Sequence, residues 1–259
     1  MFKIKKEYVW LAGIGVSIVC LIIQALFYTV LPKIRNVDQK ILMQLIVARV
    51  IHSIVEYQLI QEIYSVNSDL IYLKGVCSLY FLTETVTLCW MSIYTKCNYD
   101  KVLQLNNYQK WFFSEVALLV WLIPLLLAMI LYMLWLKLST YIISIIVITC
   151  FIFKCFVLCA NLFFSFKIFH VILNKYKRNK NCSVINTNVV DILKISFISL
   201  IMIVTSSLQA FFDDFNIIKS YTVASVEFHK RLHYNLCVIN SFQGVAITAI
   251  FLILVRSTR

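Results

Sequence analysis

Seven apolar runs of membrane-spanning length constrain this chain more than any other feature. At ~1.5 Å per residue, a helix of ~20 residues matches a hydrocarbon core of ~30 Å. The runs cover approximately residues 8–30, 41–63, 75–94, 111–134, 141–169, 189–212 and 234–255. They are continuous, whereas a transmembrane barrel needs short alternating segments. The sequence therefore predicts an all-α fold, a bundle of seven transmembrane helices.

Composition supports a membrane protein and argues against a soluble one. The chain is 61% hydrophobic and 14% charged, whereas soluble domains are about half apolar and a quarter charged. The net charge of +12 comes from short basic clusters between the apolar runs. Such clusters are typical of loops beside an anionic leaflet, so membrane lipid is an expected partner and nucleic acid is not. The nine cysteines show no disulfide framework or metal spacing, and no metal or cofactor is expected.

Seven crossings would place the two termini on opposite sides of the membrane. Residues 1–7 are then a short extracellular N-terminus, residues 8–255 the bundle and residues 256–259 a cytoplasmic tail. In this orientation the cytoplasmic segments hold twelve cations and the other side holds eight. The positive-inside rule favours this orientation by a small margin. The run 8–30 is interpreted as the first span and not as a cleaved signal peptide.

The second run carries three polar residues, Arg49, His52 and Glu56, at spacings of three and four. This spacing puts them on one helical stripe, which must face the bundle interior because lipid penalises each of them. The stripe is either a binding wall for a ligand that enters from outside or an internal network with Asn240 and Gln243. A third interpretation is that His52 senses a pH of about 6.

The seventh run holds the most specific motif. Its polar cluster ends in Gly244, and glycine allows a neighbouring helix to approach closely. Asn240-Ser-Phe-Gln-Gly244 resembles the seventh-span signature of the secretin-like (family B) seven-helix receptors. Pro32-Lys-Ile-Arg-Asn36 and Trp121-Leu-Ile-Pro-Leu-Leu-Leu127 resemble the first intracellular loop and fourth span of the Methuselah-like branch, and Asn161 matches the fifth-span asparagine.

The resemblance implies a G-protein-coupled receptor of the plasma membrane that transduces an extracellular signal, without the family's ectodomain. It implies a heterotrimeric G protein as partner, receptor homo- or heterodimers, and packing and hinge roles for Gln243 and Gly244. Pro124 is expected to kink the fourth helix. Because the third and fifth helices are neighbours in the family's bundle, we expect Glu84 and Lys154 to form an ion pair that lines the cavity. The pair is either a ligand or switch contact or a static structural pair.

Two alternatives stay open because the chain departs from the family pattern. Its sixth run has no proline or glycine to kink it, and residues 135–140 offer no cysteine to pair with Cys77. A non-signalling truncated or decoy homologue is one alternative. A seven-helix chemoreceptor channel of opposite topology is the other.

The most basic segment is expected to be a cytoplasmic loop. Its cations would contact a G protein or anionic lipid, or only set the topology; they are Lys175, Lys177, Arg178 and Lys180. Asn181 begins a glycosylation sequon that should stay bare on the cytoplasmic side. No Gly-rich phosphate loop, HExxH motif or nucleophile elbow is present, so no catalytic residue is assigned and an enzyme is not expected.

Overall fold

The computed structural model is helical throughout the part of the chain that it describes. That part comprises residues 2–30, 37–64, 70–102, 110–137, 140–178, 197–198, 200–201, 204–205, 238 and 242–257, and side chains are described for most of these. The helices are α1 (Phe2–Val30), α2 (Val37–Tyr64), α3 (Leu70–Val102), α4 (Lys110–Lys137), α5 (Thr140–Arg178) and α8 (Gln243–Ser257). The prediction of an all-α fold is confirmed for these residues. Most of the sixth predicted run and the beginning of the seventh lie outside them.

Five of these helices are long and apolar enough to cross a membrane. Among the five apolar stretches, the one in α4 has the highest mean hydropathy and is only 11% buried, whereas those in α2 and α3 have the lowest mean hydropathy and are 56% and 61% buried. In water, the most exposed helix of a bundle would be the most polar. The opposite trend is expected when lipid surrounds the bundle, and it supports a membrane protein.

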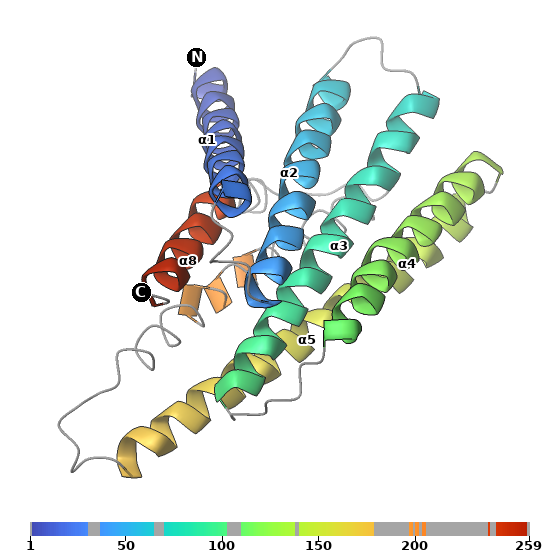
Figure 1. Cartoon of the computed structure of the whole chain (residues 1–259). Coiled ribbons are helices and arrows are strands. Elements are labelled where there is room, and N and C mark those ends of the chain that lie inside the picture. Colours follow the sequence, from blue (N-terminus) through green and yellow to red (C-terminus); the bar gives the residue numbers. More distant parts are fainter. Residues whose placement is uncertain are drawn as a thin grey trace.

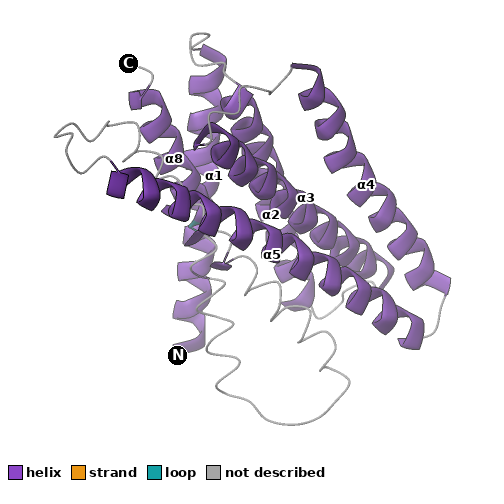
Figure 2. Cartoon of the chain, turned by 90° about the horizontal axis from the view of Figure 1, so that it is seen from below, coloured by secondary structure: helices purple, strands orange, loops and turns teal. Residues whose placement is uncertain are grey.

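Helices α2 and α3 form the centre of the bundle (Figure 1). Helix α3 also packs against α4 and α5, while α2 packs against α1, and α1 packs against α8. Helix α5 has 39 residues and extends past α3 at its carboxyl end (Figure 2). The helices on both sides shield α2 and α3 from lipid, which explains why these two can carry the buried polar residues.

The core has two layers with different chemistry. In the first half of α2 the buried stripe is apolar, and further along the same stripe becomes polar from Arg49 to Glu56. The apolar layer continues into α1, α3 and α8; its most completely buried members are Leu21, Ile41, Leu42, Leu45, Val86, Trp90, Tyr94, Ile247 and Ile250. The polar layer therefore lies toward the end of the bundle where α1 begins, because α2 runs toward that end (Figure 1).

Three helices are longer than the predicted spans. Helix α1 begins at Phe2, six residues before the first predicted span. Helix α3 continues through residues 95–102, beyond the end of the third predicted run at residue 94. Lys175, Lys177 and Arg178 also lie in a helix, the last turns of α5, and not in a loop. Lysine and arginine form helices well, and cations near a carboxyl end interact favourably with the helix dipole, so charge alone does not end a helix.

Candidate functional site

An ion pair joins α3 to α5 inside the bundle. Lys154 Nζ donates a hydrogen bond of 2.6 Å to Glu84 Oε2, and both side chains are almost completely buried. The same ammonium lies 4.4 Å from the centroid of the Phe81 ring, within range of a cation–π interaction. The predicted Glu84–Lys154 ion pair is therefore present.

A second acid and a second cation lie beside this pair. Arg49 and Glu56 of α2 are 4% and 3% exposed, and Arg49 interacts electrostatically with both Glu56 and Glu84. When all four groups are ionised, two carboxylates balance two cations. Burying charges is tolerable when each has partners of opposite sign, so the four side chains form one neutral cluster across α2, α3 and α5.

His52 completes the predicted stripe of α2. Its Nδ1 lies 3.0 Å from Thr83 Oγ1, and the Thr83 hydroxyl donates its single hydrogen to the carbonyl oxygen of Tyr80 at 3.0 Å. The Thr83 oxygen can therefore only accept from the imidazole, which assigns the proton to Nδ1. The Tyr80 ring lies 5.0 Å from the imidazole ring, between centroids. These contacts fix the orientation of His52, which is close enough to Arg49 and Lys154 to interact electrostatically with both.

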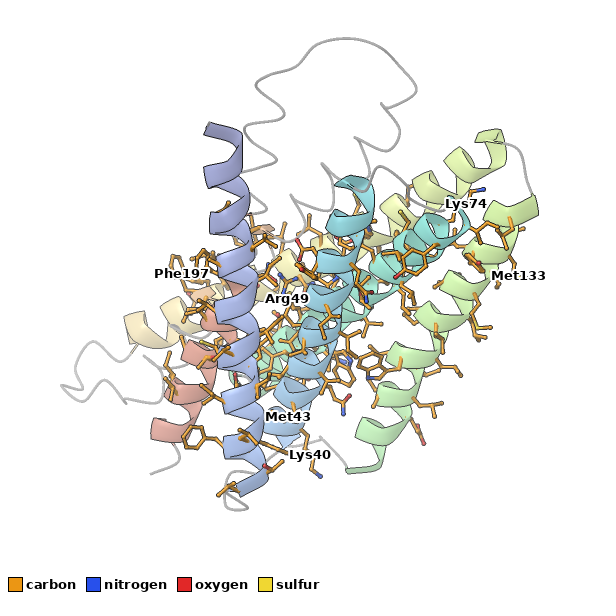
Figure 3. The ribbon with its side chains drawn as sticks, turned by 90° about the horizontal axis from the view of Figure 1, so that it is seen from above. Lys40, Met43, Arg49, Lys74, Met133 and Phe197 are labelled. Carbon is orange, nitrogen blue, oxygen red and sulfur yellow. The ribbon has the colours of Figure 1, made fainter. Side chains whose placement is uncertain are left out.

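The prediction that this stripe faces the bundle interior is confirmed, because Arg49, His52 and Glu56 are each more than nine-tenths buried. Figure 3 places Arg49 at the middle of the bundle, whereas Lys40 lies at the end of α2. We call the side chains of Arg49, His52, Glu56, Glu84 and Lys154 the charged cluster. It can bind or release protons and ions, or exchange internal partners for those of a ligand.

The start of α8 packs tightly against the middle of α1. A Cβ atom added to Gly244 would lie 2.6 Å from Ser17 Cβ and 2.6 Å from the Ser17 carbonyl oxygen. The Gly244 amide donates to Ser17 Oγ at 3.2 Å. One turn further along α8, the Thr248 hydroxyl donates to the Gly244 carbonyl oxygen at 2.9 Å and lies 3.3 Å from Gln24 Oε1. The packing role predicted for Gly244 is confirmed, and its hinge role stays a prediction.

Of the two amide residues predicted in the seventh run, Gln243 lies within the described residues and Asn240 does not. Gln243 is 3% exposed at the start of α8, and its predicted hydrogen bonds to Arg49 or Glu56 stay predictions. Asn240 lies outside the described residues.

Pro124, which is expected to kink the fourth helix, and Asn161, which matches the fifth-span asparagine, are both buried. Pro124 lies inside α4 and faces the bundle, one turn from Trp121, whose indole N–H donates to Gln44 Oε1 at 3.0 Å. Asn161 is fully buried on α5, and its Nδ2 donates to Ser92 Oγ on α3 at 2.7 Å. Both residues thus lie at helix–helix contacts.

The basic residues are only partly described. Lys175, Lys177 and Arg178 lie in the last turns of α5, while Lys180 and the Asn181 sequon lie outside the described residues. Cys77 carries a free thiol. Among the residues whose positions the structure describes, no group of three His, Cys, Asp or Glu side chains could hold a metal ion.

The sequence did not predict several side chains that form hydrogen bonds with the predicted residues or their neighbours. Ser17, Gln44 and Ser92 are single polar residues in apolar runs, and nothing in their own neighbourhood identifies the helix that each contacts. One signal was available for Ser17, because Gly13-x-x-x-Ser17 is a small-xxx-small pattern and both residues are buried. Neither the family models nor the curated proteins compared with this chain gave a match.

Proposed function

We propose that this chain is a seven-helix plasma-membrane receptor of the secretin-like family, Methuselah-like branch. Its N-terminus is outside, and it passes an extracellular signal to a heterotrimeric G protein by rearranging its helices. The charged cluster carries the proposal. A charged residue at the centre of a membrane helix costs about 2.5–3.5 kcal/mol on insertion scales, so a cluster of such residues facing a bundle interior is by default a functional site.

The relative direction of α1 and α8 supports an odd number of crossings. Ser17 contacts Gly244 and Gln24 contacts Thr248, so residue numbers increase together along the two helices and the helices are parallel. Successive helices from α1 to α5 alternate in direction (Figure 1). Parallel spans must be separated by an odd number of crossings, and α2 to α5 supply four. One further crossing is needed, and the apolar run 189–212 is the segment available for it.

The two layers of the core suggest how a signal would cross the membrane. The charged cluster links α2, α3 and α5 on the proposed extracellular side, and the apolar layer beneath it contains Trp90 and Tyr94 of α3. A ligand that offers a competing charge to Glu84 or Lys154 loosens the link between α3 and α5. Packed cores shift between discrete arrangements, so this change alters the packing at the opposite end of α3 and α5.

Signalling by tagged protein in transfected cells tests the proposal. We expect basal second-messenger output through at least one class of G protein, and we expect Lys154→Gln to change that output because it breaks the ion pair. Lys167→Gln is the matched control, since Lys167 is an exposed lysine of the same helix. If wild type and both variants reach the cell surface and none gives output with any G-protein class, the chain is a non-signalling relative and the proposal is wrong.

A further inference from the structure

Two polar contacts join one face of α5 to α3. The first is the ion pair of Lys154 with Glu84. Seven residues further along α5, Asn161 Nδ2 donates a hydrogen bond of 2.7 Å to Ser92 Oγ. A spacing of seven residues puts both contacts on the same side of the helix, about 10 Å apart along its axis. A ligand that competes for charge can break the first contact and leave the second intact.

The second contact is uncharged and well fixed. The Ser92 hydroxyl donates its hydrogen to the carbonyl oxygen of Leu88 at 2.9 Å, so its oxygen accepts the hydrogen bond from the Asn161 amide. Three residues further along α5, the Phe164 ring packs against the Tyr99 ring of α3 at 5.6 Å between centroids. These contacts hold the middle of α5 against α3 without any ion pair.

Hydrogen bonding next to the second contact does not oppose a turn of α5. Asn161 Oδ1 and Ser165 Oγ, one helical turn apart, are buried and have no hydrogen-bond partner among the groups that the structure describes. Buried polar groups in native proteins are usually paired. A rotation of α5 about Asn161 therefore breaks no described hydrogen bond of these two atoms.

Helices α2 and α3 have contacts at the level of the ion pair that do not depend on α5. His52 Nδ1 lies 3.0 Å from Thr83 Oγ1, and its ring lies 5.0 Å from the Tyr80 ring, between centroids. The carboxylate of Glu84 also interacts electrostatically with Arg49 of α2. Breaking the ion pair thus leaves Glu84 near a second cation and leaves α2 joined to α3.

Helix α5 is the less deeply packed partner of this link. The apolar stretches of α2 and α3 are 56% and 61% buried, whereas the stretch Ile152–Val171 of α5 is only 28% buried. Ile152 and Phe156, on either side of Lys154, are 62% and 71% exposed. When the ion pair breaks, α5 is therefore the helix that is most easily displaced.

We propose that breaking the Lys154–Glu84 ion pair lets α5 pivot about the Asn161–Ser92 contact, while α2 and α3 stay together. The half of α5 before Asn161 moves away from α3, and the half after it moves in the opposite direction. From Asn161 to Arg178 the helix runs about 25 Å and extends past α3 (Figure 2), so the change reaches the far end of the bundle. This inference deepens the proposed function by naming the helix that moves, and it rests on that proposal for its role in signalling.

Spin labels at three exposed positions test the pivot. One label is placed on α2 at Val47, and the others on α5 at Ile152 and His170, which are each nine residues from Asn161 and on one helical face. Attachment through p-acetylphenylalanine leaves the native cysteines unchanged. The full chain is studied in nanodiscs without ligand or G protein. The Val47–Ile152 and Val47–His170 distances are measured in separate samples by double electron–electron resonance.

The two distances should change in opposite directions when the ion pair is removed. In Lys154→Gln, the Val47–Ile152 distance should increase. The Val47–His170 distance should decrease by a similar amount, because both α5 labels are equally far from the pivot. Lys154→Met leaves no buried amide, should give the same shifts, and replaces Lys154→Gln if that variant does not fold. Lys167→Gln is the matched control, an exposed lysine of the same helix, and should change neither distance.

A second substitution tests whether the Asn161–Ser92 contact is the pivot. Ser92→Ala removes the acceptor, so in combination with Lys154→Gln the two shifts should no longer be opposite. Unchanged distances in Lys154→Gln, or two shifts of the same sign, overturn the inference, as do opposite shifts that persist in the combined variant. Opposite shifts in a chain without second-messenger output support the pivot and contradict the receptor proposal. Output without these shifts contradicts only the pivot.

Discussion

Lys154 Nζ lies 2.6 Å from Glu84 Oε2, so an ion pair ties α5 to α3 inside the bundle. Breaking a buried pair by removing one partner costs about 3–5 kcal/mol, because the other charge is left buried without compensation. Loss of this pair should therefore strongly disturb the bundle.

Reversing the charges of this pair should reveal the coupling. Glu84→Lys or Lys154→Glu alone should strongly reduce surface expression, since each places like charges together. The double reversal should restore part of the lost expression, and only part, because Arg49 also interacts with the carboxylate of Glu84. Surface levels are measured by flow cytometry against an epitope tag. A double variant no better than the single variants would disprove the pairing.

Adding a methyl group at Gly244 should separate α1 from α8. Gly244→Ala places a Cβ 2.6 Å from Ser17 atoms, and overpacking of this kind costs about 1–3 kcal/mol. Gly75→Ala is the control, because its Cβ would lie 3.6 Å from Tyr132 Cε2, which is ordinary contact. We expect a lower melting temperature for the detergent-solubilised Gly244→Ala variant alone.

A second substitution distinguishes backbone contact from side-chain contact at this position. Ser17→Gly combined with Gly244→Ala should not recover stability, because the Ser17 carbonyl oxygen and Cα also block the added methyl group. Full recovery would show that the two backbones do not approach closely.

Removing the hydroxyl of Thr83 should destabilise the charged cluster. Thr83→Val leaves the Nδ1 proton of His52 without its acceptor, and an unsatisfied buried donor costs about 1–3 kcal/mol. Thr87→Val is the comparison, since the Thr87 hydroxyl only donates to a carbonyl oxygen of its own helix. The melting temperature should fall more for Thr83→Val. An equal fall in both variants would mean that the His52 contact contributes nothing.

The sequon at Asn181 gives an independent test of orientation. In the proposed topology it faces the cytoplasm and carries no glycan. Treatment with an N-glycosidase should leave the electrophoretic mobility of the wild-type protein unchanged, as it should for Asn181→Gln. A shift in the wild type that disappears in Asn181→Gln would reverse the orientation.

The polar residues of the apolar runs made part of this structure predictable. Charge in lipid is so unfavourable that Arg49, Glu84 and Lys154 had to face inward, and the glycine after a polar cluster indicated a close helix contact at Gly244. The partners Ser17, Gln44 and Ser92 were not predictable, because they depend on the register between helices distant in sequence. The predicted end of the fifth helix was wrong for a different reason. Lys175 and Arg178 lie beyond the apolar stretch, but α5 continues through them.

The accessibility of the two termini tests the seven-helix receptor proposal most directly. Different epitope tags are attached at residues 1 and 259, and antibodies are applied to intact and to permeabilised cells. An odd number of crossings with the N-terminus outside predicts that the first tag is stained on intact cells and the second only after permeabilisation. Staining of both tags in the same state would give an even number of crossings and contradict the account, and the reverse pattern would favour the channel topology.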